Sequence, residues 1–593
     1  MAKFTTRART VEMLGRQQIA GIPTAINELF KNAHDAYANV VEVDYYRPEQ
    51  LFVLGDDGLG MTLDDFQDKW LALGTDSKIV SGGGLTEIAK DLGLPHRTVL
   101  GAKGIGRLSI AAIGPQVLIL SRARRENGLR ETVAAFVNWT MFSLPGVNIE
   151  DIEVPIQTYP NGALPTMTDV DRMVSTVSSN LQDLRNDDNN SIADLIDEQL
   201  EEFLADPSEL QFRLDKPSLT EDGCGTHFYI QPVDESLNPD IDIVDGGKAP
   251  ILRRMLIGFT NTMVPCHPTH VITPEFRDHR SAEITDEIIS EGNFFTTGDF
   301  ESADHRFRGE FDEFGQFQGD IQINDNEPIK HIVPWPEARG TPTECGPFKI
   351  DLAYVQDEAR ASRLPPEEYG RIQQKLNFFG GLYIYRDGIR VLPYGNQDHD
   401  FLHIEERRNR SAGYYFFSYR RMFGVIDIGI DANQNLVEKA GREGFRENRA
   451  YRQFRSILEN FLVQVAAEFF RAEGSEGSTF HDSREELNRQ AIAIRRRENL
   501  VSAKKVTLGH LIEDGFKWIT AGEPRSEVQT LISGLEQSLR AAADINDPDE
   551  LMGAVLKAED NARQGMSEIR QKHRISEPRG FGVSRVLRRE LDT

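Results

Sequence analysis

The sequence predicts a mixed α/β protein in which two layered α/β domains are followed by helices. Helix-like and strand-like stretches alternate over residues 21–140, which is typical of a layered α/β domain. Strand pairs with turn signals recur later in the chain, and helical spacing of apolar residues dominates its last quarter. The 593 residues are enough for several domains, and we expect them at 1–240, 241–450 and 451–593.

The first domain begins with a helix over residues 24–38, because apolar residues recur there at helical spacing. Apolar runs and alternation of apolar and polar residues predict short strands after it. These strands are expected at 40–45, 51–54, 117–120, 132–137 and 226–230.

Two further features complete the first domain. Thr62, followed three residues later by Asp65, predicts a capped start for a helix that carries Phe66 and Trp70. The segment at about 160–221 is acidic and helix-prone. We interpret it as a helical insertion or a partly mobile arm.

The second domain should contain two hairpins. One turns at Glu313-Phe314-Gly315 and the other at Asp387-Gly388, and an Asp-Gly pair between strands is a strong hairpin signal. Beyond 451 the spacing predicts successive helices over 454–472, 484–501 and 527–545.

The bulk composition excludes several classes of protein. No run of about 18 apolar residues occurs, so we expect no membrane span. The three cysteines, Cys224, Cys266 and Cys345, show no CxxC spacing, which fits a reducing cytoplasm. The net charge of −27 argues against indiscriminate coating of DNA. Local basic patches leave contact with DNA open, although solvated helix faces are the better explanation of such patches.

Glu28, Asn32 and Asp35 form the first candidate chemical motif. They lie at positions i, i+4 and i+7, so a helix places all three on one face. Oxygen ligands of this kind suit a hydrated magnesium ion, and a glutamate can act as general base. Taken alone, the pattern also fits a solvated helix face.

The second motif follows the strand at 51–54. The run from Asp56 to Met61 contains Gly58 and Gly60, and glycines after a strand allow the backbone to approach a ligand closely. A carboxylate there can accept a hydrogen bond from an exocyclic amine such as that of adenine. The alternative is an ordinary Asp-Gly turn.

The third motif is a glycine-rich loop before an apolar helix. Gly101, Lys103, Gly104, Ile105 and Gly106 precede it with GxxGxG spacing. Backbone N–H groups at a helix start bind anions. The spacing differs from both the P-loop and the Rossmann fingerprint. The alternative is a flexible loop that happens to contain a lysine.

Together with Thr226 on a later strand, these motifs resemble the GHKL superfamily over about residues 1–235. The order of motifs is especially similar to that of bacterial stand-alone heat-shock-protein-90-like ATPases, and also to MORC and MutL proteins. The resemblance implies a Bergerat-type ATP-binding domain with ATP and Mg²⁺ as ligands, a transducer-like second domain and a helical C-terminal region.

The resemblance also implies residue roles. Glu28 would be the general base, Asn32 the magnesium ligand, and Asp35 part of the pocket wall. Asp56 would receive the adenine amino group with Thr226 in support, beside Gly58, Gly60 and Met61. The phosphates would lie on Gly101, Lys103, Gly104, Ile105 and Gly106. A lid would begin at 81–84, and Lys78 would contact it or a phosphate.

A shorter resemblance lies in the second domain. The stretch 439–445 is similar to the Ser-Arg-Glu segment of the chaperone middle domain, which implies that Arg442 reaches the γ-phosphate when the domains close. Glycine replaces the serine here. The alternative is a surface Arg–Glu pair.

We therefore expect an ATPase that works as a nucleotide-gated homodimeric clamp, with segment 1–20 pairing with a second subunit. Its partner could be a protein client, a co-encoded protein or DNA. By analogy with bacterial chains of this type, a role in anti-phage defence is one hypothesis. The alternatives are a topoisomerase, MutL or MORC-like subunit and, less favoured, a histidine-kinase-type phosphotransferase.

Overall fold

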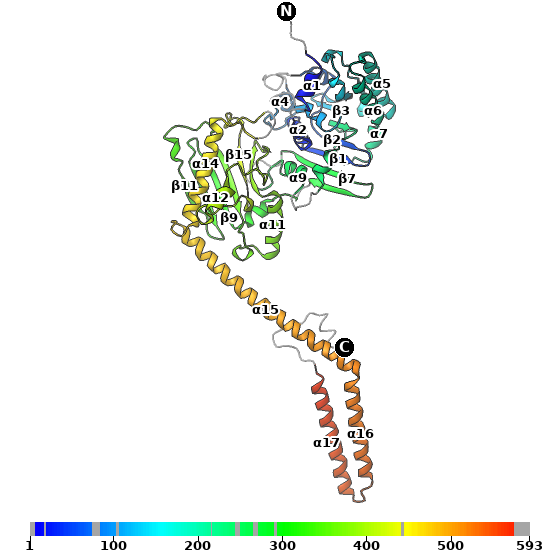
Figure 1. Cartoon of the computed structure of the whole chain (residues 1–593), viewed down its shortest axis with the longest axis vertical. Helices are drawn as coiled ribbons and strands as arrows, with labels where there is room; N and C mark the ends of the chain where they lie inside the picture. The colour runs from blue at the N-terminus through cyan, green and yellow to red at the C-terminus, as the bar shows by residue number, and fades with distance from the viewer. Residues whose placement is uncertain are drawn as a thin grey trace, which may run out of the picture. The chain divides into compact units, whose positions relative to one another are not determined.

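The computed structural model describes residues 6–16, 19–73, 84–101, 106–214, 216–242, 249–264, 271–289, 293–439 and 444–574. The chain divides into two compact units, Met1–Arg484 and Glu485–Thr593. The first unit contains two β-sheets with helices on them, and the second is helical (Figure 1). The predicted fold class is confirmed.

The first sheet has eight strands in the order β5-β4-β3-β6-β2-β1-β7-β8. All neighbours are antiparallel except β1 and β7, which are parallel. The strands are β1 (Val40–Tyr46), β2 (Leu51–Asp56), β3 (Gln116–Arg125), β4 (Gly128–Asn138), β5 (Ile156–Tyr159), β6 (Gly225–Ile230), β7 (Thr273–His279) and β8 (Thr285–Ile289). Every strand expected in the first domain is present.

The boundary expected at 240/241 does not coincide with the edge of this sheet. Strands β7 and β8 come after residue 240 in the chain, yet β7 pairs with β1 over seven residues. The division into domains at 240/241 therefore needs correction, because hydrogen bonding carries the first sheet on to Ile289.

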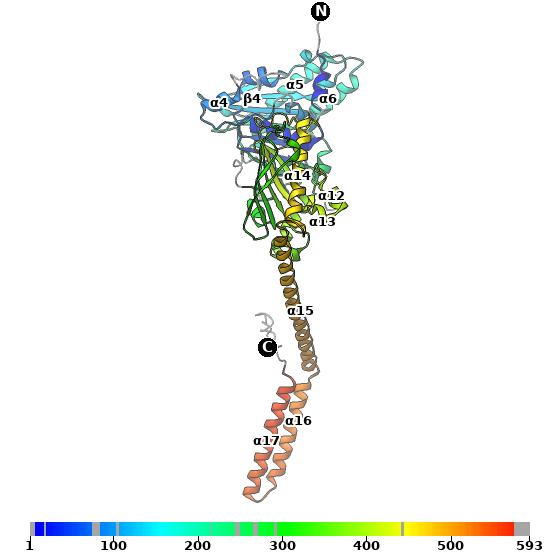
Figure 2. The same ribbon diagram turned by 90° about the vertical axis from the view of Figure 1, so that its left-hand side faces the viewer.

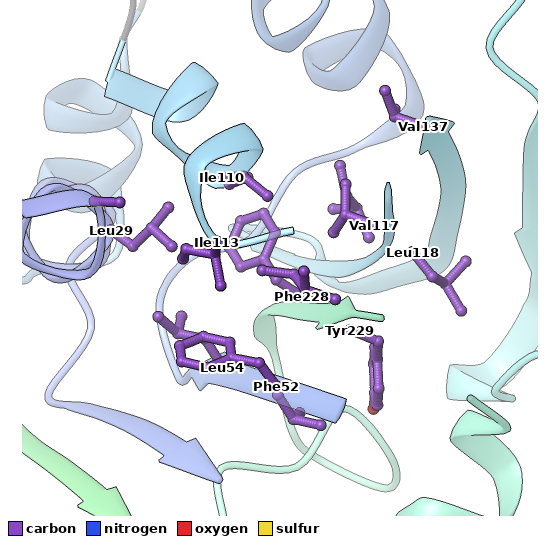
Figure 3. Packing of buried hydrophobic residues seen from close by; sticks show 14 of the residues in the cluster. Leu29, Phe52, Leu54, Ile110, Ile113, Val117, Leu118, Val137, Phe228 and Tyr229 are labelled. Carbon is purple, nitrogen blue, oxygen red and sulfur yellow. The ribbon is translucent and has the colours of Figure 1, made fainter. Parts of the chain in front are cut away.

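The central strands are buried on both faces. Leu54 and Phe228 are register partners on one face, where Leu29 and Ile113 lie opposite them (Figure 3). Leu118 pairs with Tyr229 on the other face. A sheet covered on both sides explains why every residue of β2 and β6 is buried, instead of every second one.

Helix α2 (Ile22–Asp35) carries the first motif and packs on the first sheet. It starts two residues earlier than expected, with Pro23 in its first turn, where proline is well tolerated. The capping box of Thr62 and Asp65 is present at the start of α3 (Leu63–Asp65). The turn that follows, η1 (Phe66–Trp70), is a π-helix.

The acidic segment forms helices that pack against the body of the first unit. They are α5 (Met167–Leu184), α6 (Asn190–Glu202) and α7 (Pro207–Leu210). Val170, Met173, Val177 and Leu181 are buried along one face of α5. The expected helical insertion is confirmed, and it shares the core of the first sheet.

The second sheet has seven strands in the order β11-β10-β9-β12-β15-β13-β14. Both expected hairpins are present, at β9–β10 and β13–β14. Helix α14 (Arg449–Val465) packs on one face of the sheet and α11 (Pro366–Phe379) on the other. The strands are β9 (His305–Phe311), β10 (Phe317–Ile323), β11 (Ile329–Val333), β12 (Phe348–Tyr354), β13 (Gly381–Arg386), β14 (Ile389–Arg390) and β15 (Met422–Ile428).

The expected helical region is also confirmed. Helix α15 (Gly477–Ala521) is followed by α16 (Glu523–Ala543) and α17 (Pro548–Lys572). The last two lie side by side in both views (Figure 1 and Figure 2), and Lys572 pairs with Glu527 at 2.5 Å. Among the residues that the structure describes, no helix combines the length and apolar content needed to cross a bilayer.

Candidate functional site

A cavity in the first sheet domain brings together residues from all three sequence motifs. Its walls come from α2, the loop after β2, strand β6 and the chain on both sides of the glycine-rich loop. The predicted residues on its walls are Glu28, Asn32, Asp35, Asp56, Gly60, Met61, Gly101, Gly106 and Thr226. Motifs distant in sequence thus share one site.

Several predicted site residues lie outside the described residues. This group contains Lys78, the lid residues 81–83, Lys103, Gly104, Ile105 and Arg442. Their roles stay predictions.

The acidic stripe on α2 is buried rather than solvated. Only 5% of Glu28 and 4% of Asp35 is exposed, which rules out the solvated helix face as the explanation of the motif. The Nζ of Lys31 lies 3.4 Å from Oε1 of Glu28. Buried carboxylates with neighbouring cations are common at functional sites.

Asp35 fixes the start of the glycine-rich loop. The backbone N–H groups of Leu100 and Gly101 each donate to its carboxylate at 2.9 Å, one to each oxygen. The sequence predicted only that Asp35 lines the pocket. The structure shows that it also ties α2 to the chain entering the loop, so the loop begins at a fixed distance from Glu28 and Asn32.

Gly106 closes the loop directly over the acidic stripe. A Cβ atom at this position would lie 3.3 Å from Oε2 of Glu28 and 3.7 Å from Oδ1 of Asn32. A side chain would therefore intrude into the space between the loop and α2. Glycine keeps this space open for a ligand.

Asp56 is a buried carboxyl at the end of β2. Its Oδ1 accepts a hydrogen bond from the N–H of Gly58 at 2.9 Å. Burial raises the pKa of Asp56 to about 7, the nearby charge of Asp57 adds to this, and the Gly58 N–H acts in the opposite direction. The adjacent Asp57 instead accepts backbone N–H groups at the start of β1, from Asn39 at 2.6 Å and Val40 at 2.9 Å.

Thr226 faces Asp56 across the pairing of β2 with β6. Its Oγ1 lies 2.8 Å from Oγ of Ser121, which also accepts the N–H of Met61 at 2.8 Å. Ser121 on β3 thus connects β6 with the loop after β2 at the cavity. The sequence analysis missed Ser121, although a lone serine within the apolar run of β3 is a visible signal.

Gly60 adopts a backbone conformation that favours glycine. Its φ is +59°, and an added Cβ would lie 2.2 Å from the carbonyl oxygen of Arg122. Arg125 holds this turn through the carbonyl oxygens of Leu59 at 2.9 Å and Gly60 at 3.2 Å. Contacts with Arg122 and Arg125 thus hold this turn in place, which distinguishes it from an ordinary Asp-Gly turn.

Other wall residues were not predicted, among them Lys31, Arg107 and Phe228. Arg107 directly follows the glycine-rich loop, so its position in the sequence could have identified it. It donates to the carbonyl oxygens of Lys69, at 3.0 Å, and Ala72, and burial lowers its pKa to about 10. Even so, Arg107 stays protonated at neutral pH and places a positive charge on the wall.

The donor set fits a magnesium ion that is carried by a triphosphate. In the described ranges, no three His, Cys, Asp or Glu side chains gather as a metal-binding group. Mg²⁺ commonly takes only one or two protein ligands and the rest from phosphates and water. Asn32 on the cavity wall can supply such an oxygen.

Comparison with known proteins agrees with this geometry. Residues 21–150 match the family model described as histidine kinase-, DNA gyrase B-, and HSP90-like ATPase. The matched span runs from the start of α2 past β4 and includes most of the cavity wall. Residues 21–150 therefore form a domain of the GHKL ATPase class, which is what the family model describes.

Two other comparisons give no information about function. A search of curated proteins gives no significant match. The solved structure titled "Crystal Structure of N terminal domain of a DNA repair protein" is 12% identical, with a TM-score of 0.36, over 77% of this chain and 97% of that chain. A likeness this distant carries no conclusion about function.

Proposed function

We propose that this protein binds ATP with magnesium, hydrolyses it, and acts as a nucleotide-gated dimeric clamp on a macromolecular partner. One observation carries the proposal. Glu28, Asn32 and Asp35 line the same cavity as Asp56, and Gly106 passes over the first two without a side chain in the way. A general base, a metal ligand and an adenine acceptor are thereby arranged around one space.

In this proposal different parts of the site hold the adenine ring and the phosphates of ATP. Asp56 and Thr226 hold the adenine end, where a carboxylate can accept the exocyclic amine. Asp35 fixes the loop whose N–H groups hold the phosphates. A magnesium ion held by Asn32 would neutralise charge that develops on the phosphates.

Glu28 is the proposed proton acceptor for the attacking water. Its burial places the carboxylate where bulk water is excluded, and the backbone at Gly106 leaves room beside Oε2. Orientation of the water by a fixed carboxylate lowers the barrier to in-line attack. Arg442 is proposed to contact the γ-phosphate after the two sheet domains close.

A macromolecular partner is supported by the exposed apolar side chains of α15. Ile492, Leu500, Phe516 and Ile519 are each more than half exposed, and exposed apolar groups commonly mark interaction surfaces. A second subunit, a protein client or a co-encoded protein could cover them. A role in anti-phage defence rests on the resemblance alone.

Association with DNA, the alternative, is less well supported in the second sheet domain. Two arginines of its basic stretches, residues 407–410 and 420–421, are already paired: Arg407 with Glu459 at 3.1 Å and Arg421 with Asp357 at 2.6 Å. Paired arginines at such sites have fewer donors left for phosphate groups. Stimulation of ATP turnover by duplex DNA would nevertheless favour the DNA-associated function.

The test of the proposal separates binding from turnover. Glu28→Ala should bind ATP with a dissociation constant within about threefold of wild type, whereas turnover should fall by about 100-fold or more. With ATP bound and not consumed, the variant should accumulate as a dimer in mass measurements. The exposed Glu126→Ala serves as the control. Wild-type turnover in Glu28→Ala would overturn the proposal.

A further inference from the structure

Four charged side chains form a row between the two sheet domains of the first unit. Lys31 on α2 lies 3.4 Å from Glu28 and 3.9 Å from Glu438. Glu438 in turn pairs with Arg386 on β13 at 2.9 Å. The row therefore connects the candidate base of the first sheet domain with a strand of the second.

All four side chains are largely shielded from water. Their exposed fractions are 6% for Glu28, 8% for Lys31, 15% for Glu438 and 11% for Arg386. Burial of charges is costly, and two apolar residues would join the domains at lower cost. An ionic row at this place is therefore better explained by a switching role than by stability.

Residues 438–439 and 444–445 are the described arms of a short hairpin, and Glu438 stands at its base. The N–H of Lys439 donates to Gly444 O at 2.9 Å, and Glu438 forms a β-bridge with Phe445. The N–H of Phe445 also donates to the hydroxyl of Tyr394 at 3.1 Å. The base of the hairpin is thus attached to the second sheet domain and moves with it.

We propose that Lys31 is a positioning residue that couples the position of this hairpin to the state of Glu28. One ammonium group is shared between two carboxylates on different domains. When the hairpin draws Lys31 toward Glu438, the ammonium charge moves away from Glu28, and the carboxylate of Glu28 accepts a proton from water more readily. When the hairpin withdraws, Lys31 turns to Glu28 and turnover falls.

This coupling rests on the proposed role of Glu28 and extends it to regulation of the same site. The contact is long-range, because Lys31 and Glu438 lie in different sheet domains. A two-state arrangement of this kind transmits at most the difference in free energy between its two pairings. Because Lys31 acts on Glu28, the proposed proton acceptor, the effect should appear in kcat and not in the affinity for ATP.

The test is a double-mutant cycle in the full chain. Glu438→Gln should lower kcat about tenfold, with the KM and the dissociation constant for ATP within about twofold. In a Lys31→Met background, Glu438→Gln should change kcat no further, because its effect passes through Lys31. Lys31→Arg should retain most of the wild-type kcat, since it keeps the cation.

Glu447→Gln is the matched control. This residue follows the same hairpin, but its side chain is 60% exposed and pairs with Arg455 at 3.7 Å. Its kcat should equal that of wild type. The inference is overturned if Glu438→Gln has wild-type kcat, or if it lowers kcat equally with and without Lys31.

The failure of this inference is distinguishable from failure of the proposed function. If the folded wild-type protein shows no ATP turnover, the proposed function is wrong. The coupling between Lys31 and Glu438 can then still be measured through the free energy of unfolding. In that case the losses of stability from Lys31→Met and Glu438→Gln should be non-additive. Additive losses would show that the two side chains are not coupled, and would overturn the inference as well.

Discussion

Asp56 shows most clearly how one residue in the site is tuned by its surroundings. The carboxyl is 4% exposed and accepts the backbone N–H of Gly58, and burial raises its pKa to about 7. A neutral carboxyl at this position can lose its proton when a ligand supplies a hydrogen-bond donor. The pocket is therefore sensitive to pH near neutrality.

The raised pKa of Asp56 predicts how stability depends on pH. Because the folded pKa lies above the ordinary value of 3.8, the folded protein binds the proton more tightly than the unfolded chain. The free energy of unfolding should then fall as pH rises from about 4 through about 7. Urea unfolding without nucleotide at about pH 5 and about pH 8 measures this fall. It should be smaller in Asp56→Asn, and an equal fall in both proteins would contradict the assignment.

Many site residues could be predicted from spacing, but their contacts could not. Glu28, Asn32 and Asp35 were predicted because helical geometry fixes their common face. The hydrogen bonds from Leu100 and Gly101 to Asp35 depend on the path of a loop, which no local pattern fixes. The same holds for the approach of Glu438 to Lys31.

At the scale of elements, strand pairing explains the main correction. The sequence predicted β1 and β2 correctly because their apolar patterns are local. It could not assign β7 to the same sheet, since β7 pairs with β1 across more than two hundred residues of chain. Short-range periodicity indicates that a strand exists but not which neighbour it has.

The insertion helices provide a prediction at this scale. Met173 lies buried on α5 within the core of the first sheet, so Met173→Ala should lower the free energy of unfolding by about 2–4 kcal/mol. The exposed Gln182→Ala on the same helix should change it by less than about 0.5 kcal/mol. Urea unfolding measures both. Equal effects would mean that α5 is a separate arm and not part of the core.

At the scale of the whole molecule, the features that bear on function are the net negative charge and the division of the chain into two units. A net charge of −27 disfavours long-range attraction of polyanions, yet the cavity places Lys31 and Arg107 on its walls. Two cations are thus available to a triphosphate, beside the carboxyl groups of Glu28, Asp35 and Asp56 on the same wall. The described residues of the second unit, Glu485–Thr593, include helices with exposed apolar side chains.

The central claim is that the cavity on α2 binds magnesium-bound ATP, and calorimetric titration of ATP into the full chain tests it most directly. We expect saturable binding with a dissociation constant below about 1 mM. Asp56→Asn should weaken it at least about tenfold, because an amide NH₂, which only donates, replaces one acceptor oxygen while the other accepts the N–H of Gly58. The exposed Asp68→Asn should bind as wild type does. A well-folded wild-type protein that shows no binding at millimolar ATP would contradict the claim.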